Sequence, residues 1–246
     1  TMAYTASAVA IALGNGQPIP IIFTGSQLPL VSFGTDARFN LENSLKTIID
    51  AISLRINEVM IVFQNDIMRA CRTVKISEAR FPAFDSPAFP KLGELSAVGV
   101  SFSPLARKYD SQSLTIKADF QRDILTVDLV PGLEPGLLLE VIISGKCKGL
   151  LLKSLGAGNV PSEDEYSIIP VIQRAVAEFD IPVLISTKFV GGYTRMEIYE
   201  PGVLAIEAGA ISTKDMTDVM AQVKFMWALA QGYKNSELAK VITHNY

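Results

Sequence analysis

Catalytic chemistry in this chain of 246 residues must depend on hydroxyl, carboxylate or lysine groups. The single histidine, His244, stands third from the C-terminal end, a position typical of a solvated terminus. Cys71 and Cys147 show no CxxC or other ligand spacing, and they indicate buried thiols in a reducing compartment. We therefore predict no metal site, no cofactor and no disulfide.

Lys75 is one candidate for this chemistry. It ends the segment Arg72–Lys75, which follows a predicted strand and the loop Gln64–Asp66. A lysine can act as a base or as a charge partner where burial and neighbouring charges perturb it. Position alone favours an ordinary surface lysine, so both interpretations stay open.

Two loops that follow apolar strands are further candidates. Gly25 and Ser26 begin one of them, where a glycine allows close approach of a ligand to the backbone. An ordinary turn explains the same residues equally well. The second loop, Gly156–Pro161, lacks the Lys-Ser/Thr ending of a P-loop and the third glycine of a dinucleotide loop. It predicts a tight strand-to-helix turn that presents Asn159.

The elements that carry these segments alternate between helix and strand. Apolar strands are expected at 20–24, 58–63, 124–130, 149–153 and 183–186, and helices at 2–13, 40–54, 136–144, 162–179, 217–229 and 236–243. Such alternation indicates an α/β fold with parallel sheets covered on both faces, whose ligands collect at the carboxyl ends of the strands. We predict a lobe at 1–105, a connector at 106–121 and a second lobe at 122–246.

The start of the chain is unusual. Thr1 is a plausible N-cap for a helix through Leu13 whose residues are apolar on nearly every face, which predicts a buried helix. We expect the strands that flank such a helix to lie outside this sequence. A second helix entry is expected at Asp36–Asn40, with Asn40 or a neighbour as the cap.

Composition limits the partners. The net charge of -3 and the pI of about 5.3 argue against a nucleic-acid partner, which normally requires a basic face. No apolar run reaches the roughly 18 residues of a membrane span, and the first residues lack the basic flank of a signal peptide. We therefore expect a cytoplasmic protein without a membrane partner.

Several of these segments resemble, in order, the bacterial-type L-asparaginase family. Thr1–Ala6 is similar to the end of the family signature His-Gly-Thr-Asp-Thr-Met, with Thr1 as its last threonine. Further similar segments lie at 24–29, 36–41, 72–75, 84–87, 92–93, 156–161, 207–209 and 215–217. The Ala83–Pro87 loop and the segment 208–217 resemble the cytosolic type I enzymes more than the periplasmic type II.

The resemblance implies a two-lobed asparaginase-like fold, with a larger N-terminal parallel-sheet lobe, incomplete here, and a smaller C-terminal Rossmann-like lobe. It implies hydrolysis of L-asparagine to L-aspartate and ammonia through a threonine acyl-enzyme. By the same resemblance Lys75 is held by an aspartate and draws the proton from a threonine, and the Gly25-Ser26 backbone contacts the substrate. Asn159 then reaches the site of a neighbouring subunit, in a homodimer or homotetramer, and Thr1 adjoins the active site.

The sequence departs from the family pattern in its catalytic threonines. The Thr-Gly-Gly-Thr-Ile-type motif of the first nucleophile does not occur in the 246 residues, nor does the Thr-Asp pair expected directly before Thr1. We therefore expect the isolated chain to be inactive, with the nucleophile supplied by a segment upstream of Thr1. Two alternatives are the asparaginase-like subunit of an archaeal glutamyl-tRNA amidotransferase and a catalytically dead relative that binds an amino acid or acts as a scaffold.

Overall fold

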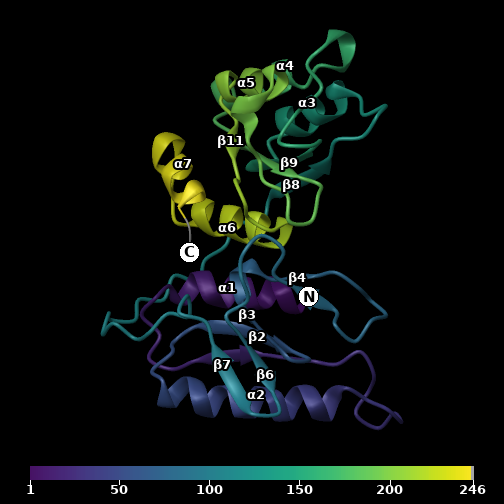
Figure 1. The fold of residues 1–246 in the computed structure, drawn as a ribbon. Helices are drawn as coiled ribbons and strands as arrows, with labels where there is room; N and C mark the ends of the chain where they lie inside the picture. The colour runs from purple at the N-terminus through teal and green to yellow at the C-terminus, as the bar shows by residue number, and fades with distance from the viewer. Residues whose placement is uncertain (245–246) are drawn as a thin grey trace. The chain divides into compact units, whose positions relative to one another are not determined.

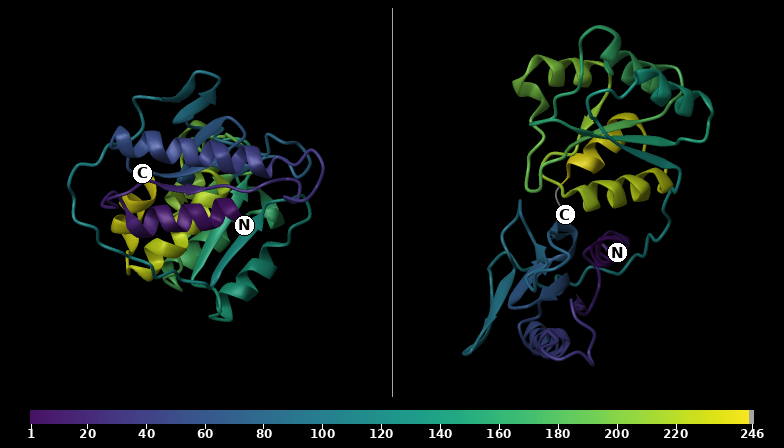
Figure 2. Two further views of the ribbon diagram at one scale, coloured as in Figure 1. Left: turned by 90° about the horizontal axis from the view of Figure 1, so that it is seen from below. Right: turned by 90° about the vertical axis from the view of Figure 1, so that its right-hand side faces the viewer.

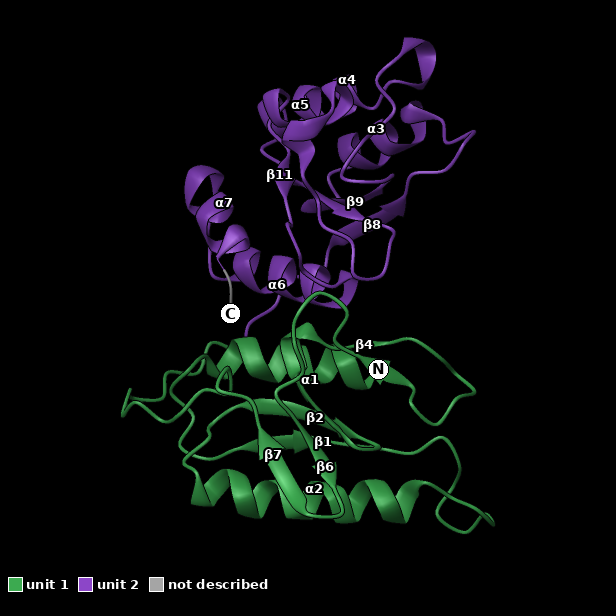
Figure 3. Cartoon of the chain, in the orientation of Figure 1, with its two compact units in different colours: residues 1–118 green, residues 119–246 purple. Residues whose placement is uncertain are grey.

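The computed structural model describes residues 1–244. The chain divides into two compact units, Thr1–Ala118 and a second unit that begins at Asp119 (Figure 3). Each unit combines a β-sheet with helices, as an α/β fold requires. Among the described residues no helix is both long enough and apolar enough to cross a membrane.

The first unit contains a five-stranded sheet with the order β1-β2-β3-β6-β7. Its strands are β1 (Ile21–Phe23), β2 (Val59–Phe63), β3 (Asp66–Arg69), β6 (Gly93–Ser96) and β7 (Gly99–Phe102). The two predicted strands, β1 and β2, pair in parallel as expected. The other three pairings are antiparallel, so this sheet is mixed. The sequence did not predict β3, β6 and β7, because they are short and carry few consecutive apolar residues.

Helices α1 (Met2–Leu13) and α2 (Ala37–Ser53) lie on opposite faces of this sheet, and both pack on β2 (Figures 1 and 2). The predicted bounds of α1 are confirmed. Its predicted burial on every face is wrong, because Tyr4 is 42% exposed. Thr1 occupies the N-cap position, but its side chain makes no capping hydrogen bond.

The helix α2 begins three residues before its predicted start, with Asp36 rather than Asn40 at the N-cap position. Its amphipathic character is the reverse of the usual one. The face toward the sheet is small and polar and includes Asn40, Asn43 and Thr47. The large apolar side chains of α2, such as Leu45 and Ile49, are exposed.

A two-stranded hairpin of β4 (Val74–Lys75) and β5 (Phe84–Asp85) follows the short 3-10 helix η1 (Ala70–Arg72). Phe84 is buried, and its ring centroid lies 5.0 Å from that of Phe63 at the end of β2. The segment Ala83–Pro87 therefore packs on the main sheet through Phe84, and its strand β5 pairs with β4, which carries Lys75.

The second unit contains a four-stranded sheet of order β11-β10-β9-β8, in which every pair is parallel, as predicted. The strands are β8 (Ile124–Asp128), β9 (Gly149–Ser154), β10 (Val183–Thr187) and β11 (Ile211–Ser212). The helices are α3 (Pro135–Ile143), α4 (Ile169–Ala177), α5 (Glu200–Glu207), α6 (Asp218–Ala230) and α7 (Asn235–Thr243), with short 3-10 helices η2 (Asp164–Tyr166) and η3 (Met196–Ile198).

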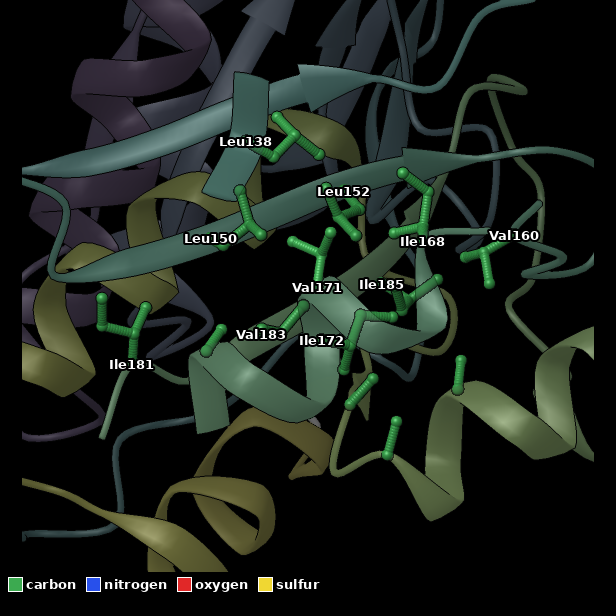
Figure 4. Close-up of a cluster of buried hydrophobic side chains, with 14 of the residues drawn as sticks. Leu138, Leu150, Leu152, Val160, Ile168, Val171, Ile172, Ile181, Val183 and Ile185 are labelled. Atoms are coloured by element: carbon green, nitrogen blue, oxygen red, sulfur yellow. The ribbon is translucent and has the colours of Figure 1, made fainter. Parts of the chain in front are cut away.

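Alternate residues of β9 and β10 form the core of this unit under α3 and α4 (Figure 4). The single helix predicted at 162–179 is wrong. The chain forms η2 and then starts α4 at Ile169, because Pro170 lacks the N–H of an interior helix residue and belongs in a first turn. The sequence did not predict α5, which likewise carries a proline, Pro201, in its first turn.

Candidate functional site

The loop after β1 carries Gly25 and Ser26, two of the predicted substrate-binding residues. Thr24 donates its hydroxyl to the Val62 carbonyl (2.8 Å), which ties the start of this loop to β2. Gly25 and Ser26 are both exposed. They lie at the carboxyl ends of the parallel pair β1 and β2, the edge where ligands collect in open α/β sheets.

Two side chains of the α2 N-terminus hold this loop. The Asp36 carboxylate accepts the N–H groups of Gln27 and Leu28 at 3.0 Å each. The Asn40 side chain donates to the Gly25 carbonyl at 2.9 Å and to the Asp36 carboxylate at 3.0 Å. The loop is therefore fixed by side-chain hydrogen bonds at three backbone groups.

Lys75 approaches the same loop from β4. Its Nζ lies 3.4 Å from Oε1 of Gln27, at the long end of hydrogen-bonding distance. Gln27 in turn donates its Nε2 to the Arg80 carbonyl at 3.0 Å. Lys75 is exposed, and its Nζ lies 5.9 Å from the centroid of the Phe84 ring. Gln27 thus links Lys75 to the Gly25-Ser26 segment.

The first turn of α1 adjoins this loop as well. A methyl group added at Gly25 would have only one side-chain or backbone atom within 4 Å, the Met2 Sδ at 4.0 Å. Thr1 is exposed at the start of the same helix. The structure therefore brings Gly25, Ser26 and Lys75 together beside the helix that Thr1 begins, with open space above Gly25.

Asn159 lies in the second unit, in the turn after β9. Its backbone exchanges hydrogen bonds with Leu155 (3.1 and 2.9 Å), which closes the predicted tight turn. Gly156 and Gly158 have positive φ angles of 52° and 112°. Thr187, at the end of β10, donates its hydroxyl to the Gly156 carbonyl at 2.8 Å. Asn159 is thus presented at the carboxyl ends of β9 and β10.

The sequence did not identify the roles of Asp36, Asn40 and Gln27. It indicates only a helix entry for Asp36 and Asn40, although their spacing of four residues places them on one helix face. Gln27 belongs to a segment that the sequence assigns to the loop, but nothing in its position along the chain relates it to Lys75. These contacts depend on the tertiary packing of β4 beside the loop.

A buried ion pair organises the first unit away from the candidate site. Arg69 donates to both carboxylate oxygens of Glu58 (2.8 and 2.6 Å). Burial acts to lower the pKa of Arg69, but the hydrogen bonds and charge of Glu58 prevail and raise it. For the nearby Cys71 thiol burial acts in the other direction and raises the pKa, against the opposing charges of Arg107 and Arg69. Both cysteines are free and buried, as predicted.

A cavity of about 580 Å³ lies in the second unit at the opposite edge of its sheet. Its lining includes Lys148, directly before β9, and Pro182, directly before β10, so it opens at the amino ends of these strands. None of the predicted site residues lines it. Within residues 1–244 we find no group of three or more histidine, cysteine, aspartate and glutamate side chains arranged to hold a metal ion.

Comparison with known proteins places both units in one family. Residues 1–106 match the family model "Asparaginase, N-terminal", and residues 123–242 match "Glutaminase/Asparaginase C-terminal domain". The chain is 31% identical to L-asparaginase 1 of Escherichia coli strain K12 over 246 residues, which is all of this chain and 70% of that protein. The structure of the thermostable L-asparaginase from Thermococcus kodakarensis superposes with a TM-score of 0.91 at 28% identity, over 100% of this chain and 71% of that one.

Longer proteins are similar to the same residues. The 60 kDa lysophospholipase of Mus musculus is 31% identical over 234 residues, which is 94% of this chain but only 40% of that protein. A glutamyl-tRNA(Gln) amidotransferase subunit of Aeropyrum pernix is 29% identical over 259 aligned residues, covering this whole chain and 58% of that protein. With motifs, fold and both family models in agreement, the chain belongs to the asparaginase family.

Proposed function

We propose that this chain forms the larger part of an amidohydrolase that converts L-asparagine to L-aspartate and ammonia. The observation that carries the proposal is the position of Lys75, whose Nζ reaches the Gly25–Leu28 loop through Gln27. A lysine beside an exposed, backbone-lined loop at the carboxyl edge of a sheet suits proton transfer to and from a bound amide.

In the proposed reaction a threonine hydroxyl attacks the side-chain amide carbon of asparagine. Lys75 draws the hydroxyl proton, the C–N bond breaks, and the nitrogen leaves as ammonia after gaining a proton. Water then hydrolyses the aspartyl ester and regenerates the threonine. A hydroxyl requires such a base because it is a weak nucleophile on its own.

The threonine nucleophile is proposed to lie outside this sequence, because the 246 residues lack the family motif that carries it. Residues Gly25, Ser26 and Asn159 contact the substrate in this proposal, and Thr1 adjoins it. Asn159 serves the site of a second copy, so a homodimer or homotetramer is part of the same proposal. The two free, buried cysteines support a reducing, cytoplasmic location.

The test measures ammonia release from L-asparagine by the 246-residue chain alone and mixed with the part of E. coli L-asparaginase 1 that precedes the matched region. We expect no release above the uncatalysed rate from the chain alone, and release from the mixture. Release by the chain alone would contradict the upstream nucleophile. A mixture that assembles but does not hydrolyse asparagine, and instead binds it unchanged, would favour the catalytically dead relative.

The second candidate is a component of a tRNA-dependent amidotransferase, which the similarity to the A. pernix protein favours. Such a component passes ammonia to a partner enzyme. This candidate predicts that amide hydrolysis by the complemented chain rises when the partner enzyme and its tRNA are added. If the rate of hydrolysis does not change when the partner enzyme and its tRNA are added, the result supports an asparaginase that acts independently.

A further inference from the structure

The polar face of α2 is unusual because it is buried. Asp36 and Asn43 are 6% and 5% exposed, and Asn40 is fully buried. A buried polar group costs free energy unless it is hydrogen-bonded. These three residues recur at spacings of four and three, so they share one helix face. Their partners show what this face does.

Asn40 uses both ends of its side-chain amide. Its Nδ2 donates to the Gly25 carbonyl (2.9 Å) and to the Asp36 carboxylate (3.0 Å). Its Oδ1 accepts the N–H of Gln64 at 2.8 Å, in the turn between β2 and β3. One buried side chain therefore joins the loop after β1 to the turn after β2.

Two neighbours complete this anchor. Asp36 accepts the N–H groups of Gln27 and Leu28 (3.0 Å). Asn43 donates to the Gln64 carbonyl at 2.7 Å. Gln64 has a φ of 52°, which is uncommon for a residue other than glycine, so its turn needs such support. The anchor thus fixes both loops at the carboxyl ends of β1 and β2.

The hydrogen bond to Gly25 has a consequence for Ser26. In a planar trans peptide group the carbonyl and the following N–H point in opposite directions. Because the Gly25 carbonyl is turned toward buried Asn40, the Ser26 N–H is turned away from the helix, to the exposed side of the loop. Lys75 reaches Gln27 in this same loop, and a Cβ at Gly25 would have open space around it.

We infer that Asn40 and Asp36 are positioning residues for the Ser26 backbone. Asn40 orients the Gly25–Ser26 peptide group and Asp36, which accepts the Gln27 N–H, orients the Ser26–Gln27 peptide group, so that the Ser26 backbone is presented to the substrate amide. The inference rests on the proposed function for the identity of the ligand. The orientation of the peptide group itself rests only on the hydrogen bonds of the first unit. Neither Asn40 nor Asp36 is proposed to touch the substrate.

Asn57 provides a matched control. It is also buried, at 7% exposure, and it also joins two segments. Its Nδ2 donates to the Gln17 carbonyl at 3.0 Å, and the Gln17 side chain donates to the Asn57 backbone carbonyl at 3.1 Å. It precedes β2, so it lies at the amino ends of β1 and β2, away from the Gly25 loop. Replacing either asparagine by leucine removes buried side-chain hydrogen bonding between two segments, at opposite edges of the same sheet. Three bonds of 3.0 Å or less are lost at Asn40 and one at Asn57.

The first arm of the test follows amide hydrogen exchange of residues 24–30 in the 246-residue chain. We expect exchange of the Gln27 and Leu28 N–H groups to accelerate about tenfold or more in Asn40→Leu and in Asp36→Ala, as the loss of a buried hydrogen bond implies. Asn57→Leu should leave these two groups unchanged relative to the global exchange rate. Equal acceleration in Asn57→Leu, or none in Asn40→Leu, would overturn the inference.

The second arm measures asparagine hydrolysis by the complemented protein. Asn40→Asp keeps the acceptor for Gln64 but replaces the donor to Gly25 by a carboxylate oxygen. We expect it to lower kcat about 10- to 100-fold with a smaller change in KM, because a misoriented donor still permits binding. Asn57→Leu should change kcat less than about twofold. A kcat unaffected by Asn40→Asp would contradict the positioning role.

The two arms separate this inference from the proposed function. If the wild-type complemented protein hydrolyses neither asparagine nor glutamine while the exchange pattern is as expected, the proposed function and the substrate assignment of Ser26 are wrong. If hydrolysis proceeds but Asn40→Asp and Asn57→Leu behave alike in both arms, the positioning role is wrong and the proposed function stands.

Discussion

The turn that presents Asn159 contains two glycines that the structure predicts to tolerate substitution very differently. Both have positive φ angles, 52° at Gly156 and 112° at Gly158. A Cβ at Gly156 would meet only the Asn159 Nδ2, at an ordinary contact distance of 3.7 Å. A Cβ at Gly158 would lie 2.7 Å from Cγ of Met196, which is completely buried. The two substitutions therefore share backbone strain, and only one adds a steric clash.

The expected losses of unfolding free energy follow from the backbone strain and the steric clash. An L residue in the left-handed region costs about 1–2 kcal/mol, which is the whole cost expected for Gly156→Ala. Overpacking of a filled core adds about 1–3 kcal/mol for Gly158→Ala, and its wider φ raises the strain to about 1–3 kcal/mol. We therefore expect Gly158→Ala to destabilise the second unit by about 2–6 kcal/mol and Gly156→Ala by about 1–2 kcal/mol.

The assay uses the single tryptophan of the chain. Trp227 is buried in α6 of the second unit, so its fluorescence during urea unfolding reports on that unit. Met196→Ala removes the Cγ atom with which the new Cβ clashes. The double variant Gly158→Ala/Met196→Ala should therefore lose less unfolding free energy than the sum of the losses in the two single variants. Equal unfolding free energies for the two alanine variants, or a double variant with purely additive costs, would contradict the steric explanation.

Three further predictions concern the first unit. Gly25→Ala should leave thermal stability unchanged or slightly raised, because the new Cβ meets only Met2 Sδ at 4.0 Å. The same substitution should lower asparagine hydrolysis by the complemented protein up to about 100-fold. A loss of stability large enough to account for the lost activity would contradict this prediction. Glu58→Gln should destabilise the unit by about 3–5 kcal/mol in urea unfolding, because it leaves Arg69 buried without its counter-charge. A loss of unfolding free energy below about 1 kcal/mol would contradict a stabilising role of the buried Arg69–Glu58 ion pair. The pKa of the Cys71 thiol is raised by burial, so the folded state holds its proton more tightly than the unfolded state does. The contribution of this thiol to the unfolding free energy should therefore be fully present below about pH 8.5, the pKa of an unfolded thiol, and be lost as the pH rises further. Cys71→Ala should reduce the fall of the unfolding free energy above that pH, and an unchanged fall would count against the prediction.

The sequence predicted the parallel strands that are apolar runs between turn residues, but not the two-residue parallel strand β11. It located β1, β2, β8, β9 and β10, and with them the loops that follow at the carboxyl edges of the sheets. It missed the hairpin strands β6 and β7, in which exposed residues alternate with partly or fully buried ones and glycine and serine interrupt the apolar residues, so they have no continuous apolar pattern.

The helix starts show a related limit. The sequence placed the start of α2 at Asn40 because polar residues precede the apolar run there. In the structure the polar residues continue into the helix, and their side chains bond to loops far along the chain instead of capping their own first turn. Local preference cannot reveal a partner that folding brings from 24 residues away.

The candidate site was predictable as a set of motifs and not as a geometry. The resemblance named Gly25, Ser26 and Lys75 together, and the structure places them around one loop. The link through Gln27 and the anchor by Asn40 were not predictable, because they depend on how β4 and α2 pack beside that loop.

The proposed function is tested most directly by replacing Lys75 and measuring ammonia release from L-asparagine by the complemented protein. Lys91 offers a matched control, because it is an exposed lysine of the same unit whose Nζ pairs with Asp66 at 2.7 Å. We predict that Lys75→Met lowers kcat by about 10²–10⁴-fold, the usual contribution of a general base, while Lys91→Met leaves it unchanged. Hydrolysis by Lys75→Met at the wild-type rate would show that Lys75 is not the base and would contradict the proposed function.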